Sequence, residues 1–249
     1  MVRIGVFVTA TLVLAQSAAG TSGELPESAP VPPARPAAED SPAPTPLTPG
    51  ARPHGTEAKN DSASPGELPD GEKACRARLA ALHVRFEGMP RVHGEGDCGI
   101  AFPINVKTLG SGVELTPDAL MNCATAVAAA QFVLETVKPA TKRQLRTELT
   151  GIRHASAYVC RNRADGDKIS EHARGNALDI AAFLLADGRE LAVQAYGPAH
   201  LRERRFLATI RRAACGPFTT VLGPGTDADH ALHLHFDLAK RRPGSTYCR

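Results

Sequence analysis

The sequence predicts an α+β fold, in which helices flank a small antiparallel sheet and disulfides staple the domain. Two strongly helical segments, 119–137 and 200–214, alternate with short strand-like runs. An even number of cysteines in a chain with an export signal indicates three disulfides, with the pairing left open. The six cysteines are Cys75, Cys98, Cys123, Cys160, Cys215 and Cys248.

The first twenty residues are typical of an export signal. Met1–Arg3 is positively charged, Ile4–Ala15 is almost entirely apolar, and Gln16–Gly20 offers small residues for cleavage. The apolar stretch is shorter than the roughly 20 residues that span a bilayer. We therefore expect residues 1–20 to be a cleaved signal peptide, which leaves no transmembrane span. An uncleaved signal that tethers the protein to the membrane is the alternative.

Residues 21–70 are predicted to be a disordered linker. Twelve of the 20 prolines fall in this segment, among Ala, Ser, Thr and Gly. A segment with so little apolar material cannot offset the entropy lost on folding. A plain spacer fits better than a proline-rich docking motif, because no short unit repeats. The folded domain is therefore expected to span residues 71–249.

The first half of that domain is expected to contain a helix over 72–85 and strands over 101–106 and 113–115. The clearest helix follows. Thr116–Asp118 supplies a cap, a first-turn proline and an acidic first turn, and Ala119–Val137 is apolar nearly all round, as in a core helix. It is expected to stop at the proline that follows.

The second half is expected to contain an arginine-rich helix over His200–Ala214. A turn at Asp187–Gly188 predicts a hairpin that leads into residues 190–193. The other strand-like runs are Ala157–Arg161, Asn176–Leu185 and Leu232–Leu238.

Charge and aromatic content argue against a nucleic-acid partner. The net charge of +3 is only mildly basic. Tryptophan is absent, and 3 Tyr and 8 Phe are too few to suggest stacking platforms for single strands.

The most informative segment is Ser170–Asp179, which reads SEHARGNALD. His172 precedes Asp179, and Gly175 between them allows a tight turn. Asp179 lies in an apolar strand-like run, where a carboxylate is costly to bury unless it is paired or bound to a metal.

A second segment, His230–Asp237, reads HALHLHFD. Because strand side chains alternate between faces, His233 and His235 are expected to project from one side and the leucines and Phe236 from the other. Imidazole nitrogens and carboxylate oxygens suit Zn²⁺, and three protein ligands leave a fourth position open for water. A hydrogen-bonded core cluster is the alternative, and the two motifs together favour a metal.

These motifs resemble those of the zinc peptidases that cut D-amino-acid bonds in bacterial cell walls, the D-Ala-D-Ala carboxypeptidases and penicillin-insensitive murein endopeptidases. More closely, residues 70–249 resemble the bacterial extensin-like C-terminal domain family. The segments that carry this closer resemblance are Tyr158–Arg161, Ser170–Ile180, Val221–Gly225 and Tyr247–Arg249. The resemblance implies a sheet with a zinc site of the D-Ala-D-Ala peptidase and hedgehog-like type.

Carried over residue by residue, the resemblance makes His172, Asp179 and His235 the zinc ligands. It makes His233 the base or transition-state stabiliser, since no Glu stands near that point. Arg161 becomes a candidate for holding a substrate carboxylate or an oxyanion, with Arg153, Arg163 and Arg174 as rivals.

Two further residues are candidates for contacts around the ligands. His230 is expected either to support a ligand or to lie on the surface, and Asp237 either to hold an imidazole or to end the strand.

The expected function is that of an exported zinc hydrolase acting on peptide bonds in peptidoglycan. A zinc-containing wall-binding module without catalysis is the second possibility, and a structural wall protein is the third. The resemblance further implies a Gram-negative periplasm as the compartment, and we expect a monomer.

Overall fold

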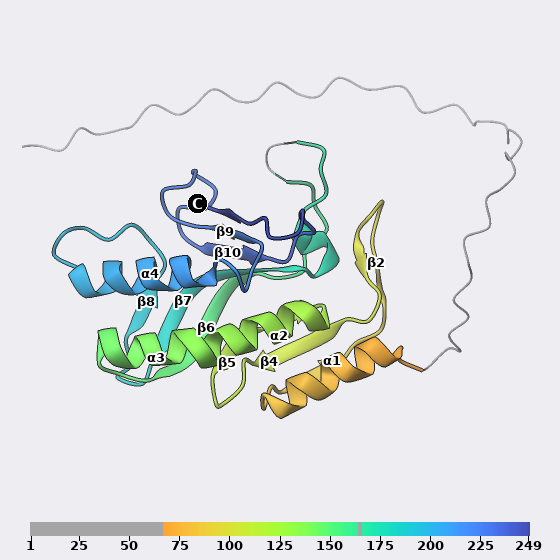
Figure 1. The fold of residues 1–249 in the computed structure, drawn as a ribbon, viewed down its shortest axis with the longest axis horizontal. Helices are drawn as coiled ribbons and strands as arrows, with labels where there is room; N and C mark the ends of the chain where they lie inside the picture. The colour runs from red at the N-terminus through yellow and green to blue at the C-terminus, as the bar shows by residue number, and fades with distance from the viewer. Residues whose placement is uncertain (1–66, 164–165) are drawn as a thin grey trace, which may run out of the picture. The chain divides into compact units, whose positions relative to one another are not determined.

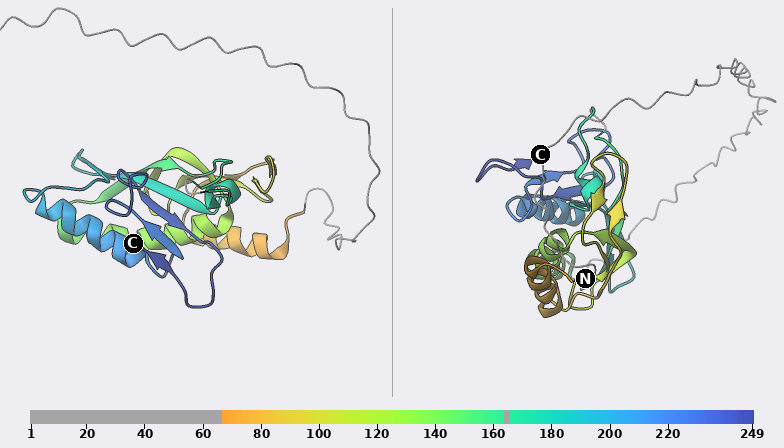
Figure 2. Two further views of the ribbon diagram at one scale, coloured as in Figure 1. Left: turned by 90° about the horizontal axis from the view of Figure 1, so that it is seen from above. Right: turned by 90° about the vertical axis from the view of Figure 1, so that its right-hand side faces the viewer.

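A computed structural model describes residues 67–163 and 166–249 of the chain. Within them, helices cover one face of a nine-stranded sheet (Figure 1, Figure 2). The expected α+β fold with helices flanking a sheet is confirmed. The expectation of a small antiparallel sheet is wrong, because the sheet has nine strands and two of its strand pairs run parallel.

The strand order places the C-terminal strands beside the middle of the chain. In order across the sheet, the strands are β1 (Phe86–Gly88), β4 (Ile104–Thr108), β5 (Glu114–Met121), β6 (Leu149–Ser156), β7 (Ala177–Leu185), β10 (Leu234–Asp237), β9 (Thr220–Leu222) and β11 (Tyr247–Cys248). β8 (Glu190–Ala192) pairs with β7 after the predicted turn, which confirms that hairpin. β2 (Val92–His93) and β3 (Gly99–Ile100) form a separate hairpin.

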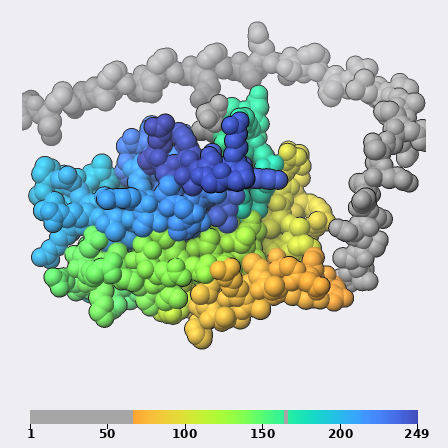
Figure 3. Space-filling model, viewed as in Figure 1, coloured from red at the N-terminus to blue at the C-terminus, as the bar shows by residue number. Residues whose placement is uncertain are grey.

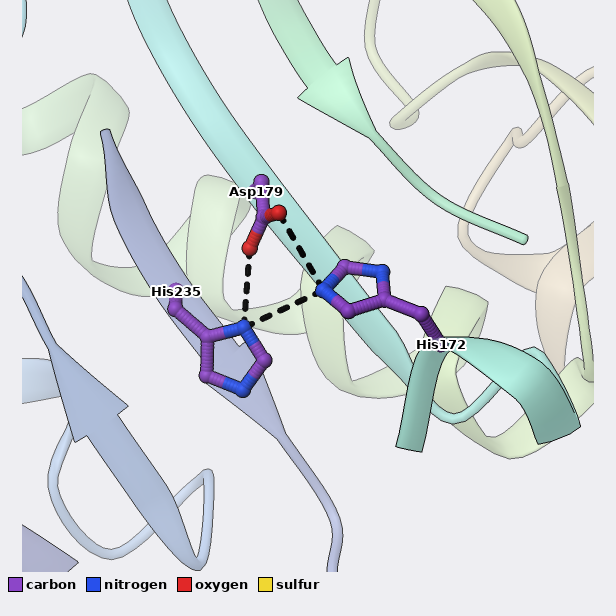
Figure 4. Close-up of side chains that lie close together, drawn as sticks. All are labelled: His172, Asp179 and His235. Atoms are coloured by element: carbon purple, nitrogen blue, oxygen red, sulfur yellow. Dashed lines mark hydrogen bonds and ion pairs between the residues drawn. The ribbon is translucent and has the colours of Figure 1, made fainter. Parts of the chain in front are cut away.

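Helical segments other than the 3-10 helix η3 (Glu171–Arg174) form the second layer, whereas η3 lies at the other face with His172 (Figure 4). The segments of the second layer are α1 (Asp70–Ala81), α2 (Cys123–Phe132), the π-helical η1 (Val133–Val137), α3 (Lys138–Ala140), the π-helical η2 (Thr141–Leu145) and α4 (Leu201–Ala214). The predicted arginine-rich helix matches α4 within one residue. The predicted first helix is too long, since α1 ends at Ala81 and His83 takes a left-handed φ of 56°.

The predicted start of the central helix at Thr116 is wrong. Thr116 lies in β5 and pairs with β6, and the helix begins only after Asn122, whose side chain accepts a hydrogen bond from Thr125 N at 2.9 Å. The predicted stop is also wrong, because helical structure continues past Pro139 to Leu145. The apolar side of this continuation is buried, so packing outweighs the local cost of the proline.

The aromatic core joins the two layers. Phe206 of α4 stands edge-on to Phe183 of β7, with ring centroids 5.1 Å apart. The ring centroid of Phe132 of α2 lies 5.8 Å from that of Phe218 and 5.7 Å from that of Phe236. The Phe236 contact fixes which face of β10 turns toward the helices, whereas on β7 a register shift between Ile180 and Ala182 separates Phe183 from Leu178 and Ile180, so all three reach the same core.

Alternation along β7 and β10 then directs polar side chains to the other face. Leu178 and Ile180 belong to the helix-side core, as do Leu234 and Phe236. Asp179, which lies between the first two, therefore points to the uncovered face of the sheet.

The three expected disulfides are confirmed, and the structure supplies their pairing. The pairs are Cys75–Cys123, Cys98–Cys160 and Cys215–Cys248. The first joins α1 to α2, the second joins the β2–β3 hairpin to the loop after β6, and the third joins the end of α4 to β11.

None of the described helices has the length and apolar character that a bilayer span requires. The predicted signal peptide, 1–20, and all but the last residues of the predicted linker, 21–70, lie outside the described residues.

Candidate functional site

Three side chains from separate segments meet on the uncovered face of the sheet (Figure 4). His172 comes from η3, and Asp179 of β7 pairs in register with His235 of β10. His172 Nε2 lies 3.1 Å from Asp179 Oδ2 and 3.2 Å from His235 Nδ1. His235 Nδ1 lies 2.8 Å from Asp179 Oδ1. The residues are only 1%, 3% and 9% exposed, respectively.

Ser170 and Gly175 begin and end the short helical turn η3 that carries His172. Ser170 Oγ accepts a hydrogen bond from His172 N at 3.3 Å and so caps η3. Gly175 ends η3 with a left-handed φ of 61°. A Cβ on Gly175 would collide with Ile100 and lie 2.9 Å from Asn122 N. The glycine is therefore needed both for its backbone conformation and for the close approach of its neighbours.

The outer nitrogen of each imidazole is already hydrogen-bonded to the protein. His172 Nδ1 contacts the carbonyl oxygen of Ala157, and His235 Nε2 lies 2.9 Å from Asp237 Oδ2. A carbonyl or carboxylate oxygen only accepts, so both of these nitrogens carry hydrogen. In their neutral forms, the two rings therefore direct lone pairs at each other and at Asp179. Three acceptors that converge in a buried space need a cation between them.

The ionisation of the cluster reflects this need. Burial lowers the pKa of His235, but the hydrogen bonds and charges of Asp179 and Asp237 outweigh it and raise the pKa to about 9. Burial raises the pKa of Asp179, but its hydrogen bonds with His172 and His235 hold that pKa well below its usual range. A proton on His235 thus balances the charge when no metal is bound. The ligand atoms lie within 4.8 Å of one another and could instead hold a metal ion.

Asp237 is fastened by two residues that sequence reasoning missed, Thr220 and Arg241. Arg241 Nη2 donates to Thr220 Oγ1 at 2.6 Å, which leaves the hydroxyl hydrogen of Thr220 for Asp237. Burial raises the pKa of Asp237, but bonds with His235 and Thr220 lower it overall. The contact between Thr220 and Asp237 follows from the register of β9 on β10, and no sequence motif announces it.

His233 lies at the site but outside the strand. β10 begins at Leu234, and Leu232 is 68% exposed, so the expectation that Leu232 fills the core is wrong. His233 Nε2 still comes within 3.6 Å of Asp179 Oδ1. Burial lowers the pKa of His233, and the charge of Asp179 only partly opposes it. His233 is therefore a neutral imidazole at pH 7.

His230 packs its ring against the histidines of the cluster and bonds its Nδ1 to Asp227 instead. Its Nδ1 lies 2.6 Å from Asp227 Oδ1, and its ring centroid lies 5.1 Å from that of His233 and 5.7 Å from that of His235. Of the alternatives for His230, the structure shows a ring that packs beside these histidines.

The family that describes the extensin-like protein C-terminus matches residues 73–249. The chain belongs to this family. No curated protein and no solved structure matches it. The match covers all residues of the site and all three disulfides of this extensin-like domain.

A pocket of ≈ 600 Å³ opens over the cluster in the extensin-like domain. Arg161 and Arg163 line it, and a bond from Ser170 N to the carbonyl oxygen of Arg161 attaches their loop to the His172 turn. Arg241 also lines the pocket, from the β9 side.

Arg161 and Arg241 have no ion-pair partner among residues 67–163 and 166–249. The rivals Arg153 and Arg174 are paired with Glu190 and Asp97 and do not line the pocket. Arg161 and Arg241, which have no carboxylate partner in these ranges, can therefore bind an anionic group with their remaining donors.

Proposed function

We propose that this extensin-like domain is a zinc-dependent hydrolase of peptide bonds between D-amino acids in peptidoglycan. The observation that carries the proposal is the convergence of His172 Nε2, Asp179 and His235 Nδ1, with the outer nitrogen of each ring already bonded to the protein. The resemblance of the two histidine motifs to wall-cutting zinc peptidases supports the choice of substrate.

The donor set fits zinc. Two imidazole nitrogens and one carboxylate oxygen are typical of catalytic zinc sites, and three protein ligands leave a position open toward the pocket. When bound, zinc acts as a Lewis acid that polarises a carbonyl and lowers the pKa of a water molecule. Asp237 would hold His235 in the tautomer that presents Nδ1 to the metal, and Ala157 would do the same for His172 Nε2.

The chain's own groups complete the proposed chemistry. His233 is neutral, half-buried and open to the pocket, so it can accept a proton from water and return it to the leaving amine. Arg161 and Arg241 can hold a substrate carboxylate or stabilise an oxyanion.

Metal analysis of the purified protein tests the first half of the proposal. We expect one zinc per chain, lost in His235→Ala and kept in His233→Ala. The exposed His93→Ala is a matched control that should change neither zinc content nor activity. A metal-free wild-type protein after incubation with zinc would contradict the proposal.

Incubation with purified peptidoglycan tests the second half. Soluble peptide fragments should form with the wild type and be lost with His233→Ala. Bound zinc with no new fragments from several wall types would support the alternative, a zinc-containing wall-binding module.

The proposal includes export to the periplasm, with residues 1–20 removed as a signal peptide, and action as a monomer. The three disulfides support an oxidising compartment. Mass measurement of the protein recovered from cells would reveal whether the chain begins after residue 20.

A further inference from the structure

The arginine-rich side of α4 has no part in the candidate site. Its buried side carries Phe206, Leu207, Ile210 and Ala214, which pack into the core. The four exposed arginines of the helix lie away from that side. They are Arg202, Arg204, Arg205 and Arg212.

A fifth arginine extends this surface onto the neighbouring helix. Gln144 Nε2 of η2 donates to Thr209 Oγ1 of α4 at 3.1 Å. Thr209 lies one turn from both Arg205 and Arg212, and Gln144 follows the exposed Arg143. Figure 3 shows α4 and the segment that ends in η2 side by side on the helical side of the domain. We call these five arginines, 143, 202, 204, 205 and 212, the basic helical surface.

The basic helical surface is not neutralised by the domain itself. None of its five arginines forms an ion pair with any residue in the described ranges. Glu203 is the single acid of α4, and it is partly buried. Some exposed arginines elsewhere on the domain face a carboxylate, as Arg85 faces Glu114 at 2.7 Å. Five unpaired guanidinium groups on two adjacent helices form a local positive field that the net charge of +3 does not reveal.

We propose that the basic helical surface docks the domain onto an anionic lipid surface, with its guanidinium groups on the phosphates. Arginine presents a planar fork of donors that matches phosphate oxygens. Leu201, 46% exposed at the start of α4, adds an apolar contact beside Arg202 and Arg205. An apolar side chain among arginines favours a lipid interface over a fully hydrated wall polymer.

The orientation that follows suits the candidate site. The pocket opens on the face of the sheet that α4 does not cover, because Asp179 and His235 point away from the helix-side core. A domain that rests on lipid through α4 and η2 therefore leaves its pocket open to the surroundings. The docking does not depend on the metal or on the proposed hydrolysis.

Co-sedimentation of the purified exported protein, without residues 1–20, with vesicles tests the docking. One set of vesicles contains phosphatidylcholine alone, and the other contains phosphatidylcholine mixed with phosphatidylglycerol. We expect binding to the anionic vesicles that weakens as salt is raised, because salt screens exposed charges. Each arginine removed near an anionic surface should weaken partitioning about fivefold, so Arg205→Gln with Arg212→Gln should weaken it about 25-fold.

The control is Arg91→Gln with Arg242→Gln, two exposed arginines outside the helical layer. This variant changes the net charge equally and should bind like the wild type. Equal binding to neutral vesicles, or equal loss in both double variants, would overturn the proposal. Failure to bind anionic vesicles while pelleting with isolated wall polymer would also overturn it, and would assign the surface to that polymer. Circular dichroism of each variant checks that it is folded.

Discussion

Removal of the charge on Asp237 tests whether the residues behind the metal ligands determine zinc affinity. Asp237→Asn keeps the shape of the side chain, but it removes the negative charge that accepts from His235 Nε2 at 2.9 Å. Carboxylates that hold a ligating imidazole typically contribute 10- to 100-fold to metal affinity. We therefore expect zinc binding to weaken by roughly 1.4–2.7 kcal/mol.

In the metal-free protein, the effect of Asp237 can be measured on the pKa of His235. Asp179 and Asp237 together move the pKa of His235 from 6.5 to about 9 against the effect of burial, which corresponds to roughly 3 kcal/mol. Since Asp237 is one of the two carboxylates that raise this pKa, Asp237→Asn should lower the pKa of His235. His235 should then lose its proton at a lower pH, as an NMR titration of its ring would report.

Chelator competition measures the zinc affinity, and Asp229→Asn is the matched control. Asp229 lines the same pocket and undergoes the same chemical change, but it makes no contact with a ligating imidazole. Equal zinc affinity in the two variants would refute the reasoning that Asp237 orients and charges His235.

Three further predictions concern the turn at Gly175, the proton that zinc displaces from His235, and the disulfide between Cys215 and Cys248. Gly175→Ala should lower the free energy of unfolding by roughly 2–4 kcal/mol, because it combines a left-handed φ with collisions. Gly112→Ala, with φ 75° and open space around it, should cost only about 1 kcal/mol in the same denaturant titration. His235 is protonated below about pH 9, so zinc should displace about one proton from it at pH 7. Zinc should therefore bind more weakly as the pH falls. Calorimetry in buffers of different ionisation enthalpy measures the proton release, and finding none would contradict this prediction. Replacing Cys215 and Cys248 by Ser, which opens a loop with a sequence separation of 33, should cost about 4 kcal/mol, and an unchanged denaturation midpoint would exclude that contribution.

Several predictions that rested on local pattern agree with the structure. The helix α4, the strand β7 and the tight turn at Gly175 each have a signal within a few residues. The two short motifs, through the resemblance they carry, also indicated which residues would meet: His172 lies in a glycine-closed turn, and Asp179 and His235 lie on strands with a buried face.

The predictions that failed are those in which distant backbone decided the outcome. Thr116–Asp118 has good helix-capping residues, yet Thr116 pairs with Arg153 in the sheet. Ala157–Arg161 has the composition of a strand but forms a loop, because its backbone bonds to the segment around His172. The carbonyl oxygen of Ala157 contacts His172 Nδ1, and Val159 N donates to the carbonyl oxygen of His172. The conformational propensity of a residue does not depend on such distant hydrogen-bond partners, so it cannot predict them.

By itself, the sequence determined the α+β class, and the family resemblance carried by its short motifs pointed to the three side chains that converge, since both rest on residue type and local pattern. Only the tertiary structure decided the disulfide pairs, the parallel strands and the support of His235 by Asp237, Thr220 and Arg241. The physical reason is that these contacts depend on strand register and loop closure between residues far apart in the chain. Hydrogen bonding and burial choose among the many registers that local sequence allows.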